Sequence, residues 1–207
     1  MKTKKGDFVE LQFVGRLDDG KVFDLNDKEV AKKEGINSKL DRVIVCIGEG
    51  DIVQGLDEEL TDKEIGNKFN VNVSAEKAFG KREAKLLQLV NANKFKDQQV
   101  RPYPGLQLNI DGRIGIVKTV SGGRVMIDFN NPLAGRDLKY EAVVLKIVDD
   151  VNEKIKFSLK NLLGNVIFEF KEGKLSLKTK LPAELKGLLE EKLKNRIKEI
   201  KEIEYTK

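Results

Sequence analysis

The sequence contains no histidine, no tryptophan and a single cysteine, Cys46. Without histidine, and with only one thiol, the chain lacks the ligands of the usual zinc sites and the commonest general acid–base catalyst. Cys46 has no partner for an internal disulfide, and its place in the apolar run 43–47 predicts a buried strand residue in a reducing environment. These absences exclude much conventional hydrolase chemistry, and we expect neither a metal nor another cofactor.

Long hydrophobic runs are also missing. No uninterrupted apolar stretch approaches the roughly 18 residues that a membrane-spanning helix needs, and the N-terminal MKTKKGDFVE lacks the apolar centre of a secretion signal. We therefore expect a cytoplasmic protein with no membrane partner. The 39 basic and 34 acidic residues leave a net charge of +5, a nearly balanced surface that favours solubility over a nucleic-acid-binding stripe.

At 207 residues the chain exceeds the usual size of one domain, so two or three small domains are expected. Apolar and polar residues alternate over residues 6–17, which predicts a half-buried strand. Asp18–Gly20 supplies a turn, and residues 22–24 resume an extended segment.

The next segment, residues 25–39, is polar and rich in turn formers, which predicts a long exposed flap. Residues 43–47 then predict a short buried strand. Apolar residues at four-residue intervals from Ile52 to Leu60 predict a short helix over residues 53–60.

Residues 69–73 alternate again, as in a half-buried strand. Between residues 86 and 129 the character changes to apolar strands separated by hairpin signals at Asp111–Gly112 and Ser121–Gly123. This segment predicts a small, mostly β module. Most of its many apolar side chains must form its own core, and a surplus could stay exposed for binding. A final alternating strand begins near Leu138.

A third unit begins beyond Asp150, where the charge density rises. VIFEF and KLSLKTK flank residues 171–173, which predicts a hairpin, and Pro182 opens a helix. The apolar stripe from Leu185 to Ile197 is more typical of an internal packing face than of a dimer seam. A terminal strand over residues 200–205 is only weakly marked.

Several short motifs occur along the chain in a fixed order. They are Phe13 with Gly15, Asp19–Gly20 with Phe23–Asp24, Ile47–Gly48, Ile52–Asp57 and Ala78–Gly80. In this order and spacing the chain resembles the FKBP family of peptidyl-prolyl isomerases. The run NPLAGR at residues 131–136 resembles the motif that ends the inserted domain of SlyD-type members. Residues 151–207 resemble the additional C-terminal domain of long archaeal members.

The resemblance implies an α+β fold: an FKBP antiparallel half-barrel with a short helix, an inserted small β-rich domain and a C-terminal α+β domain. The implied boundaries are residues 1–85 with 130–150 for the isomerase domain, 86–129 for the insert and 151–207 for the last domain. The implied function is to accelerate X-Pro isomerisation in unfolded polypeptides, which the insert captures as a chaperone.

Isomerisation of an X-Pro bond needs no nucleophile, because its barrier of about 18–20 kcal/mol comes from amide resonance and no bond is made or broken. A dry apolar pocket solvates the planar amide poorly and so favours the twisted form. By motif position, the resemblance implies apolar walls, one acid at the rim and one residue from the returning loop. The walls are Phe13, Phe23, Val43, Ile52, Val53, Leu56, Phe79 and Tyr140, the acid is Asp24, and the loop residue is Leu133.

Four positions depart from the family pattern. Phe13 stands where the family usually has Tyr, and Val43 stands where it usually has Phe. Leu56 stands where the family usually has Trp, and Phe79 stands where it usually has Tyr. The last two departures favour an alternative, a holdase chaperone or interaction module with a weak or inactive isomerase pocket. In either case the expected partners are unfolded or partly folded polypeptides that contain proline. A homodimer through residues 151–207 is left open, and RNA contact is a minor alternative.

Overall fold

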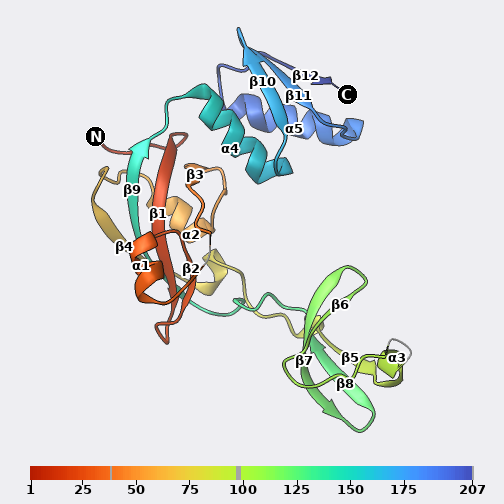
Figure 1. The fold of residues 1–207 in the computed structure, drawn as a ribbon. Coiled ribbons are helices and arrows are strands. Elements are labelled where there is room, and N and C mark those ends of the chain that lie inside the picture. Colours follow the sequence, from red (N-terminus) through yellow and green to blue (C-terminus); the bar gives the residue numbers. More distant parts are fainter. Residues whose placement is uncertain (38, 97–98, 207) are drawn as a thin grey trace. The chain divides into compact units, whose positions relative to one another are not determined.

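The computed structural model describes residues 1–37, 39–96 and 99–206, which fold into two compact units (Figure 1). The first unit joins Met1–Val73 with Asp137–Lys207, and the second is Ser74–Arg136. Ser38 of the predicted flap, residues 97–98 of the predicted insert and the final Lys207 lie outside the described residues. Both units combine strands with helices, so the α+β class is confirmed.

A five-stranded antiparallel sheet forms the body of the first unit. Its strands are β1 (Phe8–Leu17), β2 (Val22–Leu25), β3 (Val43–Cys46), β4 (Lys68–Val73) and β9 (Leu138–Ile147). The order is β2-β1-β9-β4, and β3 pairs with β1 beyond the end of β2. β1 therefore has β9 along one edge, and β2 and β3 share the other. All five lie in segments that the sequence pattern predicted to be extended.

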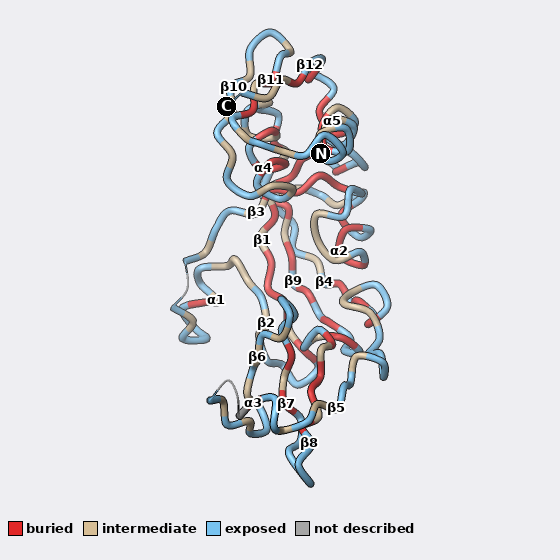
Figure 2. The backbone as a smooth tube through the Cα atoms, turned by 90° about the vertical axis from the view of Figure 1, so that its right-hand side faces the viewer, coloured by how far each residue is buried: buried red, intermediate tan, exposed pale blue. Residues whose placement is uncertain are grey.

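Alternation along β1 sends Leu11, Phe13 and Gly15 to one face of the sheet. Directly opposed residues of antiparallel strands share a face. Val43 lies opposite Leu11, and Tyr140 lies opposite Gly15, so both belong to this face as well. Figure 2 shows many buried residues along β1 and β9, the two central strands of the sheet.

The predicted helix after residue 52 is present as α2 (Gln54–Glu59), which packs against β4. Leu56 and Leu60 are buried, as their four-residue spacing predicted. Gly55 permits the close approach to the strand, because a Cβ at this position would lie 2.5 Å from Val73 Cγ1.

Residues 25–39 contain a helix that the sequence pattern did not predict. In α1 (Lys28–Lys33), the carboxylate of Asp27 caps the N-terminus by accepting hydrogen bonds from the backbone N–H groups of Glu29 and Val30, at 2.8 and 3.1 Å. Ala31 is buried, while most of its neighbours are half-buried or exposed. The segment is therefore partly helical, and the Asp27 cap is the signal that could have revealed it.

The C-terminal segment adds two helices and a three-stranded sheet. They are α4 (Val151–Leu163), β10 (Ile167–Lys171), β11 (Lys174–Lys178), α5 (Ala183–Arg196) and β12 (Glu202–Thr206). β10 and β11 form the predicted hairpin, and β12 pairs in parallel with β11. Figure 1 shows both helices on one side of this sheet.

Helix α4 was not predicted. Its N-cap is Asp150, whose carboxylate accepts a hydrogen bond from the backbone N–H of Glu153 at 2.7 Å. An Asp followed three residues later by Glu is a helix-start signal that the sequence contained. Of the helices in the described ranges, none is long and apolar enough to span a bilayer.

One hydrophobic core joins the C-terminal segment to the five-stranded sheet. Phe8 of β1 and Ile44 and Cys46 of β3 belong to the same cluster of buried side chains as residues from α4, α5 and β11. The members from the C-terminal segment are Ile155, Phe157, Leu159, Leu175, Leu177, Leu189, Leu193, Ile197, Ile200 and Ile203. The predicted packing role of the α5 stripe is thus confirmed for its second half, whereas Leu185 and Leu188 are exposed.

The second unit contains a four-stranded antiparallel sheet in the order β5-β8-β7-β6. The strands are β5 (Leu87–Asn91), β6 (Gln107–Ile110), β7 (Arg113–Ser121) and β8 (Arg124–Asp128), and a short helix, α3 (Asn93–Lys96), follows β5. The core comprises Phe95, Val117, Val125 and Ile127. The two predicted hairpin turns connect β6 to β7 and β7 to β8.

Two leucines of α5 test the shared core of the first unit. Leu193 is fully buried, whereas Leu188 is 61% exposed on the same helix. Leu193→Ala should lower the free energy of unfolding by about 2–5 kcal/mol because it leaves a cavity. Leu188→Ala should change it by about 0.5 kcal/mol or less. Urea unfolding measures both, and equal effects would contradict the described packing.

Candidate active site

Gly15 of β1 lies between two of the predicted site residues. It is opposite Asp24 of β2 on one side and opposite Tyr140 of β9 on the other. These two predicted site residues therefore flank Gly15 on the same face of the sheet.

A β-bulge brings Phe23 to this face. The register of the β1–β2 pair shifts between Gly15, which pairs with Asp24, and Arg16, which pairs with Val22. Phe23 is thus the extra residue, and a bulge can redirect a side chain that strict alternation would send to the opposite face. The consecutive residues Phe23 and Asp24 can consequently both serve one site.

Three aromatic rings meet on this face. The ring centroids of Phe23 and Tyr140 lie 5.7 Å apart at an interplanar angle of 83°, and those of Phe13 and Tyr140 lie 5.9 Å apart at 64°. Both are edge-to-face arrangements, which the charge distribution of aromatic rings favours. A Cβ on Gly15 would lie 2.7 Å from Phe23 Cζ and 3.0 Å from Tyr140 Cε1. The rings therefore rest on the glycine backbone.

Desolvation dominates the electrostatics of this face. Burial raises the pKa of the Tyr140 phenol, and the negative charge of Asp24 raises it further. Desolvation also raises the pKa of the Asp24 carboxyl, although a hydrogen bond from the backbone of Leu25 opposes the change. Tyr140 is accordingly neutral at physiological pH, and the largely buried aromatic cluster is an apolar environment with one carboxyl group beside it.

The other predicted site residues are divided between the two units. Val43 lies on the same sheet face, and Ile52 and Val53 are half-buried in the loop before α2. Leu56, on α2, is buried. Phe79 and Leu133 are half-buried residues of the second unit. Their segments are joined by a hydrogen bond of 2.7 Å from the backbone N–H of Gly135 to the carbonyl of Gly80.

Asn26 supports the site and was not among the predicted residues. Its Oδ1 accepts a hydrogen bond from the backbone N–H of Phe13 at 2.7 Å, and its Nδ2 donates to the carbonyl of Leu11 at 2.8 Å. The side-chain amide thereby takes the place of a neighbouring strand on the edge of β1. An Asn in a polar segment is common in turns, so no local signal distinguishes this role.

Asp57 is a second supporting residue that was not predicted. Its buried carboxylate accepts hydrogen bonds from the backbone N–H groups of Gly48 and Gly50, each at 2.9 Å. These contacts fix the loop that precedes Ile52 and Val53. An acid in the first turn of α2, shortly after two turn glycines, is the signal that could have identified it.

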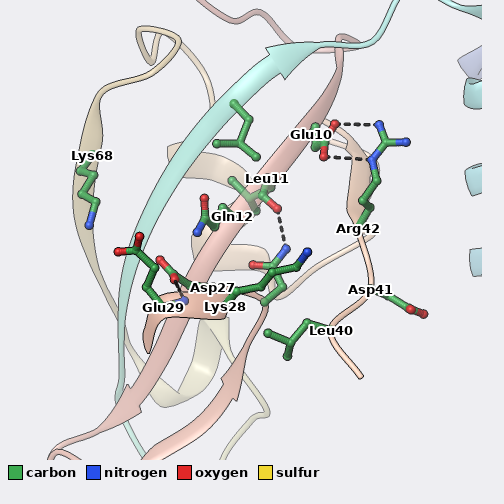
Figure 3. A pocket seen from close by; sticks show the side chains of 12 residues that line it. Glu10, Leu11, Gln12, Asp27, Lys28, Glu29, Leu40, Asp41, Arg42 and Lys68 are labelled. Carbon is green, nitrogen blue, oxygen red and sulfur yellow. Dashed lines mark hydrogen bonds and ion pairs between the residues drawn. The ribbon is translucent and has the colours of Figure 1, made fainter. Parts of the chain in front are cut away.

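A hollow of about 510 Å³ opens on the opposite face of the sheet (Figure 3). Several of its charged residues form ion pairs, either with one another or with residues nearby. Glu10 and Arg42 form hydrogen bonds of 2.7 and 3.0 Å, Arg42 also contacts Glu153 at 2.9 Å, and Lys68 contacts Glu141 at 2.9 Å. Arg42 lowers the pKa of Glu10. None of the predicted site residues lines this hollow, so it is not the predicted pocket.

No group of three or more acidic or cysteine side chains within the described ranges is placed to hold a metal ion. The aromatic face offers burial and shape, with the Asp24 carboxyl beside the rings. Such a face can exclude water from an amide that it covers.

Comparison with known proteins places the chain in a family. The family model of FKBP-type peptidyl-prolyl cis-trans isomerases matches residues 1–94, and that of the FKBP26 IF domain matches residues 88–133. A short-type peptidyl-prolyl cis-trans isomerase of Methanocaldococcus jannaschii is 31% identical over 140 residues, which cover 66% of this chain and 88% of that protein. SlyD of Escherichia coli is 28% identical over 158 residues, which cover 75% of each.

The chain belongs to the family of FKBP-type peptidyl-prolyl cis-trans isomerases. Both the resemblance drawn from the motifs and the enzyme class that it implied are confirmed. The match to the IF domain falls within the second unit, in agreement with a SlyD-like member that carries an inserted domain.

Two glycine substitutions test the close packing at Gly15. Gly15→Ala should lower the free energy of unfolding by about 1–3 kcal/mol, because the new methyl group overlaps Phe23 and Tyr140. Gly187→Ala is the control: the added Cβ would meet nothing within 4 Å in α5, and alanine should raise helix stability by about 1 kcal/mol. Denaturant unfolding distinguishes them, and a neutral Gly15→Ala would show that the rings do not rest on this backbone.

Proposed function

We propose that the chain is a folding catalyst that accelerates X-Pro isomerisation in unfolded polypeptides, with the aromatic face of the first unit as its catalytic surface. The observation that carries the proposal is the contact of Phe13 and Phe23 with Tyr140 above Gly15. Val43, Ile52, Val53 and Leu56 supply further apolar walls. For Phe79 and Leu133 the assignment rests on the motif resemblance alone.

The proposed mechanism is preferential burial of the twisted amide. The planar amide is stabilised by charge-separated resonance, which water solvates well, and this resonance is lost at the top of the rotation barrier. Walls such as Phe23 and Tyr140 replace water by apolar surface, so they disfavour the planar form more than the twisted form. No proton has to move, and Asp24 acts at the rim as a polar group for substrate backbone.

The tyrosine at the centre of the cluster tests the proposed activity. Tyr140→Leu removes both ring contacts and should lower kcat/KM for a short X-Pro peptide by about tenfold, which corresponds to about 1.4 kcal/mol of transition-state stabilisation. Tyr103→Leu is the control, because Tyr103 is an exposed residue of the second unit. A coupled peptide assay measures both. Absence of catalysis in the unmodified protein would favour the holdase alternative.

We further propose that the inserted domain captures unfolded chains on the outer face of its sheet. Pairing of β5, β8 and β7 puts Leu87, Leu89, Met126, Ile114 and Ile116 on the face opposite the core. Leu89 is 61% exposed and Ile114 is 60% exposed. Exposed apolar side chains on one face of a sheet suit apolar segments of unfolded polypeptide, whose sequence varies but whose backbone is extended.

The base of the insert is closed by a polar network around Asn130. Its side chain accepts a hydrogen bond from the backbone N–H of Glu83 at 2.8 Å and donates to the carbonyl of Glu83 at 3.1 Å and to Asp128 at 2.8 Å. Burial would raise the pKa of Asp128, but hydrogen bonds from Asn130 and an ion pair with Arg82 outweigh it and lower the pKa. The two chain segments at the base are therefore held side by side.

Because the ends of the insert are adjacent, it can be removed without stretching the chain. The backbone N–H of Phe129 donates to the carbonyl of Leu86 at 2.9 Å. Deletion of residues 86–128, bridged by two glycines, should slow catalysed refolding of a proline-limited protein by about 10²-fold or more, because capture raises the effective concentration of prolines near the site. Turnover of a short peptide should change little.

A double substitution examines the capture face without removing the domain. Leu89→Ser with Ile114→Ser should reduce catalysed refolding while peptide turnover stays the same. Val120→Ser is the control, because Val120 is also partly exposed but lies on the other face. Equal losses on the protein and peptide substrates would refute this division of labour.

We also propose that the chain is divided into three domains: residues 1–85 with 130–150, residues 86–129, and residues 151–207. We further propose action in the cytoplasm, where Cys46 would stay a reduced, buried thiol.

The exposed Ile167, Leu185 and Leu188 of the C-terminal segment suit a homodimer contact. Sedimentation velocity would detect such a dimer as a concentration-dependent increase in mass.

A further inference from the structure

Arg196 is the last residue of α5 and places a charged group in the interior of the first unit. Its side chain is 2% exposed. The neighbouring Leu193 and Ile197 belong to the core shared with β1 and β3 and are fully buried. Their packing fixes the end of α5, so the guanidinium group of Arg196 has little freedom to move. A buried cation is costly unless partners satisfy it.

The Arg196 side chain binds three acceptors in the loop that joins β3 to α2. Its Nη1 donates to Asp51 Oδ1 at 2.9 Å, its Nη2 donates to the carbonyl of Glu49 at 3.0 Å, and its Nε lies 3.2 Å from Glu49 Oε2. Asp51 is itself buried, with 6% of its side chain exposed. One planar group thus binds a backbone oxygen and two carboxylates at once, which only arginine can do.

The same loop is fixed from two other directions. The second oxygen of Asp51 accepts a hydrogen bond from the backbone N–H of Cys46 at 3.0 Å. Asp57 holds the backbone N–H groups of Gly48 and Gly50, which both have positive φ angles, 82° and 71°. Glycines in the left-handed region have many alternative conformations, so side-chain contacts have to select one.

We propose that Arg196 is a positioning residue for the isomerase site. The loop that it binds continues directly into Ile52 and Val53, two walls of the proposed pocket. Arg196 acts on them through Glu49 and Asp51, and it does not touch the substrate. The inference rests on the proposed function, and it makes the C-terminal segment a part of the catalytic apparatus in addition to a part of the core.

Three variants separate positioning from stability. Arg196→Met keeps the packing of the stem but leaves the buried Asp51 carboxylate without its counter-ion, so it should lower both the stability and kcat/KM. Arg196→Met combined with Asp51→Asn removes the unpaired charge, so the unfolding midpoint in urea should recover towards that of the unmodified protein. The loop still lacks the hydrogen bonds from Arg196, so kcat/KM for a short peptide should remain about tenfold or more below normal.

Arg196→Lys provides the conservative test. Lysine keeps the charge beside Asp51 but cannot bind three acceptors in one plane, so it should restore stability more completely than kcat/KM. Arg42→Met is the matched control: Arg42 also contacts two carboxylates, Glu10 and Glu153, one of them from α4, but its side chain is 46% exposed and neither carboxylate belongs to the loop. Its kcat/KM should stay within about twofold of normal.

The conformation of the loop between β3 and α2 can be measured independently of activity. Hydrogen exchange of the Cys46 amide, together with the amide chemical shifts of Ile52 and Val53, should change in the two Arg196→Met variants and not in Arg42→Met. Recovery of kcat/KM in parallel with stability, or unchanged shifts at Ile52 and Val53, would overturn the proposal. If the unmodified protein showed no catalysis, the proposed function would fail, while the amide measurements would still decide whether Arg196 holds the loop.

Discussion

The first unit depends on β1, because this strand pairs with three others. β9 runs along one edge from Val9 to Leu17, and β3 and β2 divide the other edge. The same strand contributes Phe8 to the core shared with the C-terminal segment and Gly15 to the floor beneath the aromatic rings. A register slip of one residue would send Phe13 to the charged face of the sheet. The site and the core therefore require the same register.

The strands of this sheet could be predicted because one face of the sheet is buried and the other is more exposed to solvent. That difference imposes an alternation with period two on β1, β4 and β9, and a sequence records it directly. Helices α1 and α4 were missed because their apolar residues are interrupted by lysines and by Ser158. The caps at Asp27 and Asp150 would have revealed them, since a cap depends on one residue and not on a periodic pattern.

The candidate site could be predicted only as a set of segments. Motif order assigned Phe13, Phe23 and Tyr140 to one site. The structure adds the reason that Phe23 can reach the other two rings, which is a β-bulge that no local sequence pattern predicts. The supporting residues could not be predicted from the sequence, for a different reason. Arg196 and Asp51 are separated by 145 positions in the chain, and nothing near either residue indicates a partner so distant.

The buried pair of Arg196 and Asp51 also bears on how the C-terminal segment should be understood. Burying two charges costs desolvation free energy, and apolar residues of similar size often stabilise an interior equally well or better. The surrounding leucines and isoleucines already join α5 to the sheet, so cohesion alone does not require the pair. The charges instead fix the geometry, because a guanidinium and a carboxylate set distances and angles that apolar contacts leave free. This constraint has its largest effect on a loop that contains Gly48 and Gly50 and continues into Ile52 and Val53.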